Sequence, residues 1–224
     1  MATINQRIEE LIGSDYAVIP ANSVNDLINA AVNEIADSLP PELLLKYVHY
    51  KAMVGASGLD ATEEKKILLV TREIADAGTE VRECKAIPFF EFLRAQDSSS
   101  IYQATVESPV YTYDVTTAAD PKLRIFPEPT TDQVGLVWYF TYIEGTNGNY
   151  ASATDINGLP NSCLQAVVLK ACMNILQAYI SDFVQDEEDN EMQTMITAQM
   201  QSLAQQYNME MGRFMEQDAT PRGE

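Results

Sequence analysis

Apolar residues recur at three- and four-residue steps through the first forty positions and predict two amphipathic helices. The first covers residues 3–13, where isoleucine and leucine share one face and a glycine ends the pattern. The second follows Pro20 and stops at Pro40, because proline cannot continue a helix. We expect a further helical piece over residues 42–51.

Beyond residue 65 the pattern changes to that of extended chain. Two short apolar runs flank a turn and predict a hairpin, at residues 66–71 and 79–82. A helical turn is expected over residues 87–93. Three later segments are rich in β-branched and aromatic residues, which favour strands of an antiparallel sheet: residues 110–113, 123–126 and 134–143.

The chain has no glycine or proline between Pro160 and Gly212, which predicts one long helix or two. The first part of this stretch is apolar on almost every side, so it must be covered by its own domain or by a neighbouring subunit. The second part has one apolar stripe on an otherwise Gln-rich surface. If these 51 residues formed one unbroken helix, it would extend roughly 75 Å, beyond the diameter of a domain of this size, so a projecting arm, or a hairpin that clasps a partner, is expected.

These elements place the chain in the α+β class, with N-terminal helices, a central antiparallel β-sheet and long C-terminal helices. We expect a helical core with a β insertion. One α+β domain would cover residues 1–183, with its β region at about 66–143 and a helix at about 160–183. An acidic helical arm, rich in Met and Gln and ending in a flexible tail, would follow over residues 184–224.

Acidic residues outnumber basic ones, 33 to 14, and give a net charge of −19. This charge argues against general nucleic-acid binding and against anionic membranes, because both need clustered Lys and Arg. The N-terminus lacks a signal-peptide pattern, and no apolar run is long enough to span a bilayer. The protein is expected to be soluble and not exported.

Charge is also distributed unevenly, since Lys170 is the only basic residue from position 125 to position 212. A solvated face explains this asymmetry. Two other interpretations are that unlike-charged halves of adjacent copies meet, or that acid lines a passage through which DNA slides without binding.

The residues offer little catalytic chemistry. His49 is the only imidazole and is expected to be structural. Cys84, Cys163 and Cys172 lack CxxC spacing and lie in apolar segments, so we expect small buried thiols in a reducing compartment. No phosphate-binding glycine loop occurs.

One acidic cluster could be imagined as a hard-cation site: Asp186, Glu187, Glu188, Asp189 and Glu191. It lacks the alternating oxygen ligands and the glycine of a calcium loop. Acids at the start of the second C-terminal helix are favoured by the helix dipole, and an acidic surface is the simpler interpretation. We expect no catalytic residue, metal or cofactor.

The order of the elements and a few loose motifs resemble a known family. The motifs are Val110-Tyr-Thr-Tyr113, an Ile-x-Pro-x-Pro strand end at Ile125–Pro129, the aromatic strand Val134–Tyr142, and Asp155-Ile-Asn-Gly-Leu-Pro160 before the long helix. Over most of residues 3–183 the chain resembles the head–tail adaptor proteins of tailed bacteriophages, also called neck or connector proteins, including the tail tubular A type.

The resemblance implies a virion protein of the neck, assembled in the host cytoplasm. It implies a closed ring of identical subunits, generally a dodecamer, that docks on the portal protein and on a downstream tail or neck protein. DNA would pass through the ring without specific binding, and no membrane is involved. The family brings no catalytic residues. Two alternatives stay open: a tail terminator, stopper or baseplate protein, and a metal-dependent enzyme that uses the acidic cluster at 186–191.

Surplus apolar and aromatic side chains suit a ring assembled from copies. The side chains expected at subunit or partner interfaces are Trp138, Tyr139, Tyr142, Leu164, Val168, Ile175, Tyr179, Met192, Met195, Ile196, Leu203 and Tyr207.

Overall fold

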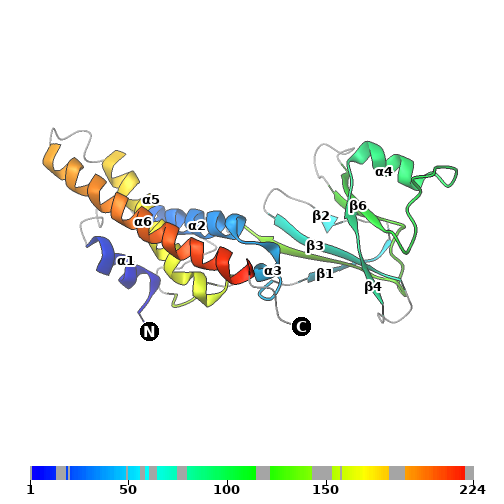
Figure 1. Ribbon diagram of the computed structural model, residues 1–224, viewed down its shortest axis with the longest axis horizontal. Coiled ribbons are helices and arrows are strands. Elements are labelled where there is room, and N and C mark those ends of the chain that lie inside the picture. The colour runs from blue at the N-terminus through cyan, green and yellow to red at the C-terminus, as the bar shows by residue number, and fades with distance from the viewer. Residues whose placement is uncertain are drawn as a thin grey trace. The chain divides into compact units, whose positions relative to one another are not determined.

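The computed structural model forms two compact units, one helical and one of β-structure. It describes residues 2–13, 19, 21–48, 50–55, 59–60, 65–74, 80–114, 122–142, 153–156, 158–181 and 190–219. The helical unit comprises Met1–Pro40 and Ile143–Glu224, and the β unit comprises Pro41–Tyr142 (Figure 1). The β unit is therefore an insertion between two parts of a helical core, and the expected α+β class is confirmed.

The helical unit contains the predicted helices of both ends of the chain. It consists of α1 (Ile4–Ile12), α2 (Ala21–Ser38), the short 3₁₀ helix η6 (Asn161–Cys163), α5 (Leu164–Tyr179) and α6 (Asn190–Ala219). The stretch after Pro160 thus forms two long helices. A capping box starts α1, because Thr3 and Gln6 each accept a hydrogen bond from the other's backbone N–H.

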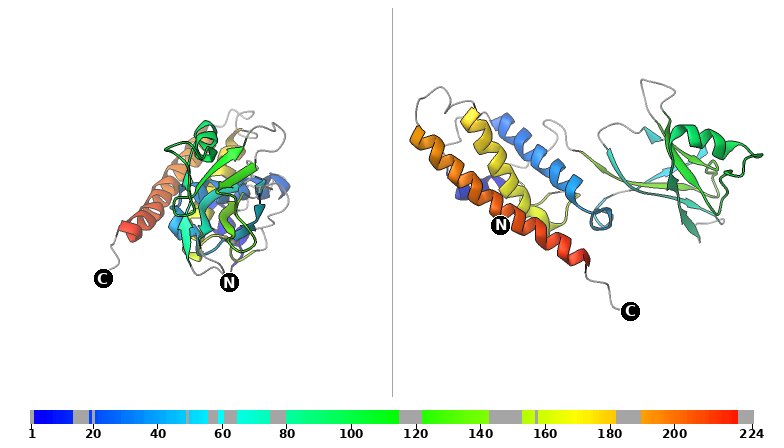
Figure 2. Two further views of the ribbon diagram at one scale, coloured as in Figure 1. Left: turned by 90° about the vertical axis from the view of Figure 1, so that its right-hand side faces the viewer. Right: turned by 45° about the horizontal axis from the view of Figure 1, so that its top comes forward.

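Helix α5 is the centre of the helical unit. Nine of its sixteen residues are buried, and α1, α2 and α6 all contact it. Figure 2 shows α5 lying between α2 and α6. Side-chain amides link these helices: Asn174 of α5 donates to the Leu27 carbonyl of α2 at 3.4 Å, and Gln199 of α6 donates to the Leu11 carbonyl of α1 at 3.0 Å.

The described residues of the β unit form two four-stranded sheets, where the sequence predicted one. The first has the order β1 (Tyr50–Met53), β8 (Gly135–Thr141), β3 (Lys65–Glu73) and β4 (Val81–Glu83), with all pairs antiparallel. The second has the order β2 (Leu59–Asp60), β7 (Lys122–Phe126), β6 (Val110–Asp114) and β5 (Lys85–Ala86). The predicted hairpin is the β3–β4 pair; its turn lies outside the described residues.

Two features of the β unit differ from the sequence prediction. Strands β5 and β6 are parallel, because α4 (Phe89–Gln96) forms the crossover between them. The predicted helix over residues 42–51 is wrong beyond its first turn: α3 covers only Pro41–Leu44. Tyr50 instead opens β1 opposite Trp138, with ring centroids 5.4 Å apart, and such cross-strand aromatic pairs favour a strand.

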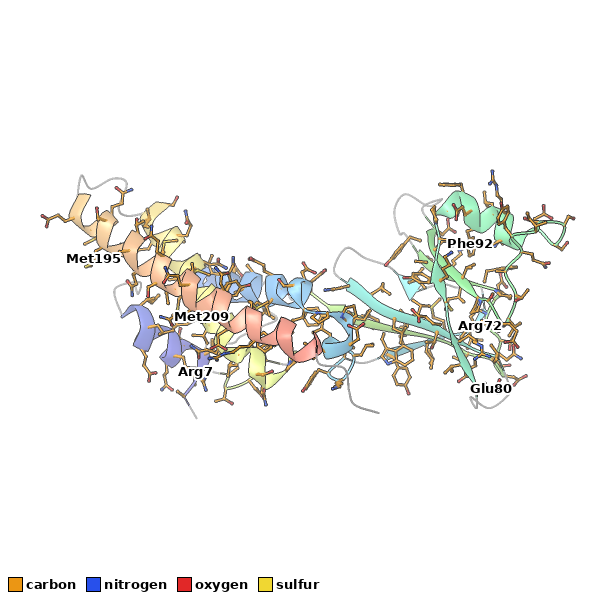
Figure 3. All side chains as sticks on the ribbon, viewed as in Figure 1. Arg7, Arg72, Glu80, Phe92, Met195 and Met209 are labelled. Carbon is orange, nitrogen blue, oxygen red and sulfur yellow. The ribbon has the colours of Figure 1, made fainter. Side chains whose placement is uncertain are left out.

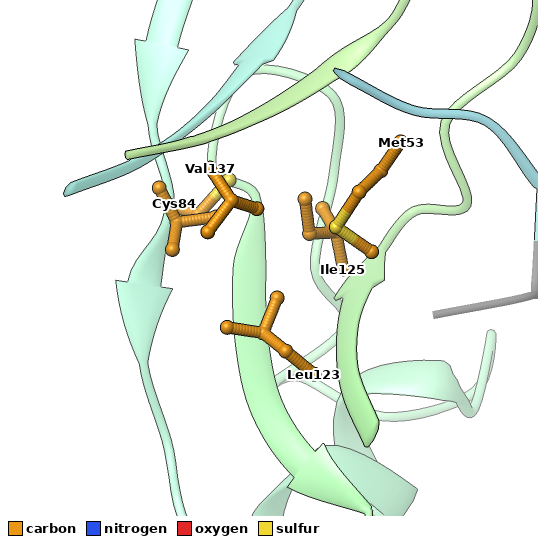
Figure 4. Packing of buried hydrophobic residues seen from close by; sticks show 6 residues of the cluster. Met53, Cys84, Leu123, Ile125 and Val137 are labelled. Carbon is orange, nitrogen blue, oxygen red and sulfur yellow. The ribbon is translucent and has the colours of Figure 1, made fainter. Parts of the chain in front are cut away.

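The two sheets bury a shared core (Figure 4). Its buried members come from both sheets and from the β4–β5 junction: Met53, Val70, Cys84, Leu123, Ile125 and Val137. Gly135 permits close approach at this point, because a Cβ there would lie 2.7 Å from Ile125 Cδ1 and 3.0 Å from Pro129 Cγ.

Arg72, labelled in Figure 3, is a buried cation whose guanidinium donates to backbone carbonyl oxygens. Its guanidinium donates to the carbonyl oxygens of Pro127 at 3.0 Å, Glu73 at 3.1 Å and Glu128 at 3.3 Å. Burial lowers the pKa of Arg72. The side chain thus ties strand β3 to the chain that follows β7.

We expect Gly135→Ala to lower the free energy of unfolding by about 1–3 kcal/mol, because the added methyl group overlaps Ile125 and Pro129. Denaturant unfolding measures the change. Gly212→Ala is the matched control, since a Cβ at position 212 meets nothing within 4 Å; it should stabilise α6 by about 0.5–1 kcal/mol. Adding Ile125→Val to Gly135→Ala should recover part of the loss, and equal stability of wild type and Gly135→Ala would refute the packing described here.

The three cysteines are free and buried, as predicted. Burial raises the pKa of Cys84 and Cys172 to about 12 and that of Cys163 to about 11. At about pH 8 the native thiols should therefore react slowly with Ellman's reagent, whereas all three should react quickly in guanidinium chloride. One fast thiol in the native protein would contradict this packing.

The same pKa shifts predict alkaline destabilisation. The unfolded thiols ionise near the ordinary pKa of 9.0 and the folded ones only at about 11–12. The thiol contribution to stability should therefore be complete below about pH 9 and be lost as the pH rises from 9 to 12. Unfolding midpoints measured over this pH range should therefore fall less steeply for Cys84→Ala than for the wild type.

Candidate assembly surfaces

The predicted interface residues divide into buried and accessible groups. Leu164, Val168 and Ile175 are buried inside the helical unit, where α1, α2 and α6 of the same chain contact α5. Ile196 and Leu203 are buried as well. Their apolar surface is covered within one chain.

The aromatic residues of β8 are half-buried. Tyr139 packs against the sheet core, and the Tyr142 ring lies 6.0 Å edge-on from Phe140. Trp138 pairs with Tyr50, whose side chain is 60% exposed. Trp138 and Tyr50 thus form an aromatic pair that is partly open to a partner.

A polar cluster joins α6 to the rest of the helical unit. Lys170 Nζ lies 2.6 Å from Glu34 Oε1 and 6.0 Å from the centroid of the Tyr207 ring. The pKa of Tyr207 is raised, mainly because the side chain is partly buried. The hydrogen bond between Tyr207 and Ser38 partly offsets this by lowering the pKa. The one basic residue of positions 125–212 is thus used to hold α2, α5 and α6 together.

The outward side of α6 carries no charge over residues 192–209. Ala198, Gln201, Gln205 and Met209 recur at three- and four-residue steps on this side and are all exposed; we call them the α6 face. Met195 and Met209, labelled in Figure 3, are 66% and 63% exposed. A groove of about 550 Å³ lies along the same helix and is lined by Gln193, Thr194, Thr197, Ala198 and Gln201.

A second unusual surface lies on α4 and the loop that follows it. Four of the eleven exposed large apolar side chains among the described residues fall between positions 90 and 102; they are Phe90, Leu93, Ile101 and Tyr102, which we call the α4 patch. Ile101 is 91% exposed. In contrast, Phe92 turns inward, where its ring lies 6.1 Å from that of Phe126.

The loop of the α4 patch is held by local hydrogen bonds. The Ser99 N–H binds Asp97 Oδ1 at 2.9 Å, and the Tyr102 N–H binds Ser100 Oγ at 3.1 Å. The Ala104 N–H returns to the Ala95 carbonyl at 3.0 Å and closes the loop against α4. Ile101 and Tyr102 are therefore displayed by a folded turn, a feature that sequence analysis did not single out.

Most of the acidic cluster lies outside the described residues, namely Asp186, Glu187, Glu188 and Asp189, and so does His49. Glu191 is exposed in the first turn of α6. Among the residues that the structure describes, no three or more His, Cys, Asp or Glu side chains gather as metal ligands. No described helix is both long enough and apolar enough to span a bilayer.

Comparison with known families shows which family this chain belongs to. Residues 1–223 match the family described as SU10 adaptor protein. The chain belongs to the SU10 adaptor family. No curated protein matches the chain.

The SU10 adaptor family is a family of bacteriophage head–tail adaptors, so the chain is a structural adaptor protein of a phage and a component of the virion. An adaptor interacts with other virion proteins. The family is not normally enzymatic, and the SU10 adaptor chain is therefore best described by its contact surfaces.

Replacing Lys170 tests whether the polar cluster anchors α6. Lys170→Gln should lower the free energy of unfolding by about 0.5–1 kcal/mol, because Glu34 is half exposed and regains water. Hydrogen exchange should speed up most in α6. Arg213→Gln removes an exposed pair with Glu210 at 2.6 Å and should cost less than about 0.5 kcal/mol. Equal effects of the two variants would contradict an anchoring role.

Proposed function

We propose that this chain is the subunit of a closed ring, a dodecamer, that joins the portal protein to the next tail or neck protein and leaves a channel for DNA. The observation that carries the proposal is the family match over residues 1–223. It extends well beyond the resemblance over residues 3–183 that the sequence motifs supported.

The distribution of charge supports a head-to-tail ring. The β unit holds ten basic and fifteen acidic residues, a net charge of −5, whereas the helical unit holds four basic and eighteen acidic ones, a net charge of −14. In a head-to-tail ring each copy presents two different faces to its neighbours. Because ten of the fourteen basic residues lie in the β unit, ion pairs between copies form most readily where the β unit of one copy meets the acidic helical unit of the next.

The same charge suits a channel for DNA. A net charge of −19 leaves few cations to bind phosphates, and binding through counterion release needs clustered Lys and Arg. DNA would pass such a ring without being held. Of the residues expected at interfaces, Met195 is exposed, and the half-buried ones are Trp138, Tyr139, Tyr142, Tyr179, Met192 and Tyr207. Among these, Trp138, Tyr142 and Met195 are our candidates for contacts with copies or virion neighbours.

Mixing the purified chain with portal rings tests this function. We expect the chain alone to be a monomer or a weak oligomer at low micromolar concentration, and native mass spectrometry of the mixture to show a dodecamer bound to each portal. The portal would template a ring that single contacts are too weak to hold.

Failure to bind the portal, combined with binding to isolated tail tubes or baseplates, would replace the proposal with a terminator, stopper or baseplate role. Stable rings of the chain alone at low micromolar concentration would contradict the templated assembly.

A further inference from the structure

The proposed ring requires two complementary faces on every copy, and the structure offers one pair. Resting on that proposed function, we infer that the α4 patch of one copy docks on the α6 face of the next copy. The contact would be heterologous, with the β unit of one subunit meeting the helical unit of its neighbour.

The α4 patch has the properties of a docking element. Its four apolar side chains are each more than half exposed and fall within thirteen residues of the chain, and apolar side chains gathered at the surface mark interaction sites. Local hydrogen bonds hold its loop, so docking would order little additional chain. Ile101 stands out furthest, with 91% of its surface exposed.

The α6 face is the surface that a second copy of this chain can approach. Every copy carries a charge of −19, so like charges oppose contact across most surfaces. Helices α1, α2 and α4 expose charged side chains such as Glu9, Asp37 and Glu91. By contrast, residues 192–209 of α6 carry no charge, and at about 1.5 Å per residue they offer roughly 27 Å of neutral surface.

Side-chain chemistry also matches. The side chains of Thr197, Ala198 and Gln201 on α6 are exposed, and Ile101 and Tyr102 are exposed in the loop after α4. Methionine side chains adapt to a partner and contact aromatic rings favourably. The exposed side chains of Met195 and Met209 are therefore suited to contact Phe90 and Tyr102 of the next copy.

The small size of the contact explains why one such interface would be weak. Four apolar side chains on the α4 patch are far fewer than the roughly 20–30 residues per side of a standard interface. Two isolated copies would associate weakly. Closure of a ring, or a template, would then supply the remaining stabilisation.

Cross-linking between two single-cysteine variants tests the contact. Ile101→Cys chains are mixed with Ala198→Cys chains at about 0.5 mM in total, where weak contacts are populated, and a short bismaleimide is added. The three native thiols are buried and should react slowly. Since each variant carries one accessible thiol, a 101–198 product can form only between two copies.

We expect about tenfold more cross-linked dimer from this mixture than from Ile101→Cys mixed with Asp26→Cys, an exposed control position on α2. Ile101→Lys should reduce the association constant, and Gln201→Glu on the partner should restore it, with unfolding midpoints showing that both variants fold.

Sedimentation at the same concentration separates the two levels of the proposal. Association of the copies without a 101–198 product would overturn this contact. So would a larger yield of cross-linked dimer from Ala198→Cys alone than from the mixture. Neither result would contradict the proposed ring. Copies that stay monomeric there and also form no ring on portals would overturn the ring itself.

Discussion

Helix α5 can fold only if other segments cover it, since nine of its sixteen residues are buried. Helices α1, α2 and α6 provide that cover, so the first forty residues and the last eighty must meet in one unit. The intervening residues, Pro41–Tyr142, are free to form a unit with its own core between two sheets. Burial of one helix thus sets the organisation of the whole chain.

Periodicity predicted the helical elements because their apolar stripes are local. Helices α1 and α2 follow the expected ranges closely. The sheet arrangement could not be obtained in this way: strand β8 resembles β6 and β7 in composition, yet it pairs with β1 and β3. Pairing depends on partners distant in sequence, such as Tyr50 opposite Trp138. The contact with Trp138 favours a strand at Tyr50, where the sequence predicted a helix.

Candidate surfaces were harder to predict than elements. Composition could not say whether α5 would be covered by its own chain or by a neighbour, and several expected interface residues proved to be buried within one chain. The reverse holds on α4, where Phe90 and Phe92 are two positions apart but only Phe92 faces the core. The uncharged run 192–209 could be seen in the sequence, but its exposure required the packing of α6.

The central claim is that side chains of this adaptor serve to fit copies around a channel within the virion. Electron cryomicroscopy of intact particles, with this chain traced in the density, tests it most directly. The account predicts a ring of identical subunits between portal and tail with DNA or an open channel on its axis. Density for the chain at any other place in the particle, or as isolated copies that enclose no channel, would contradict it.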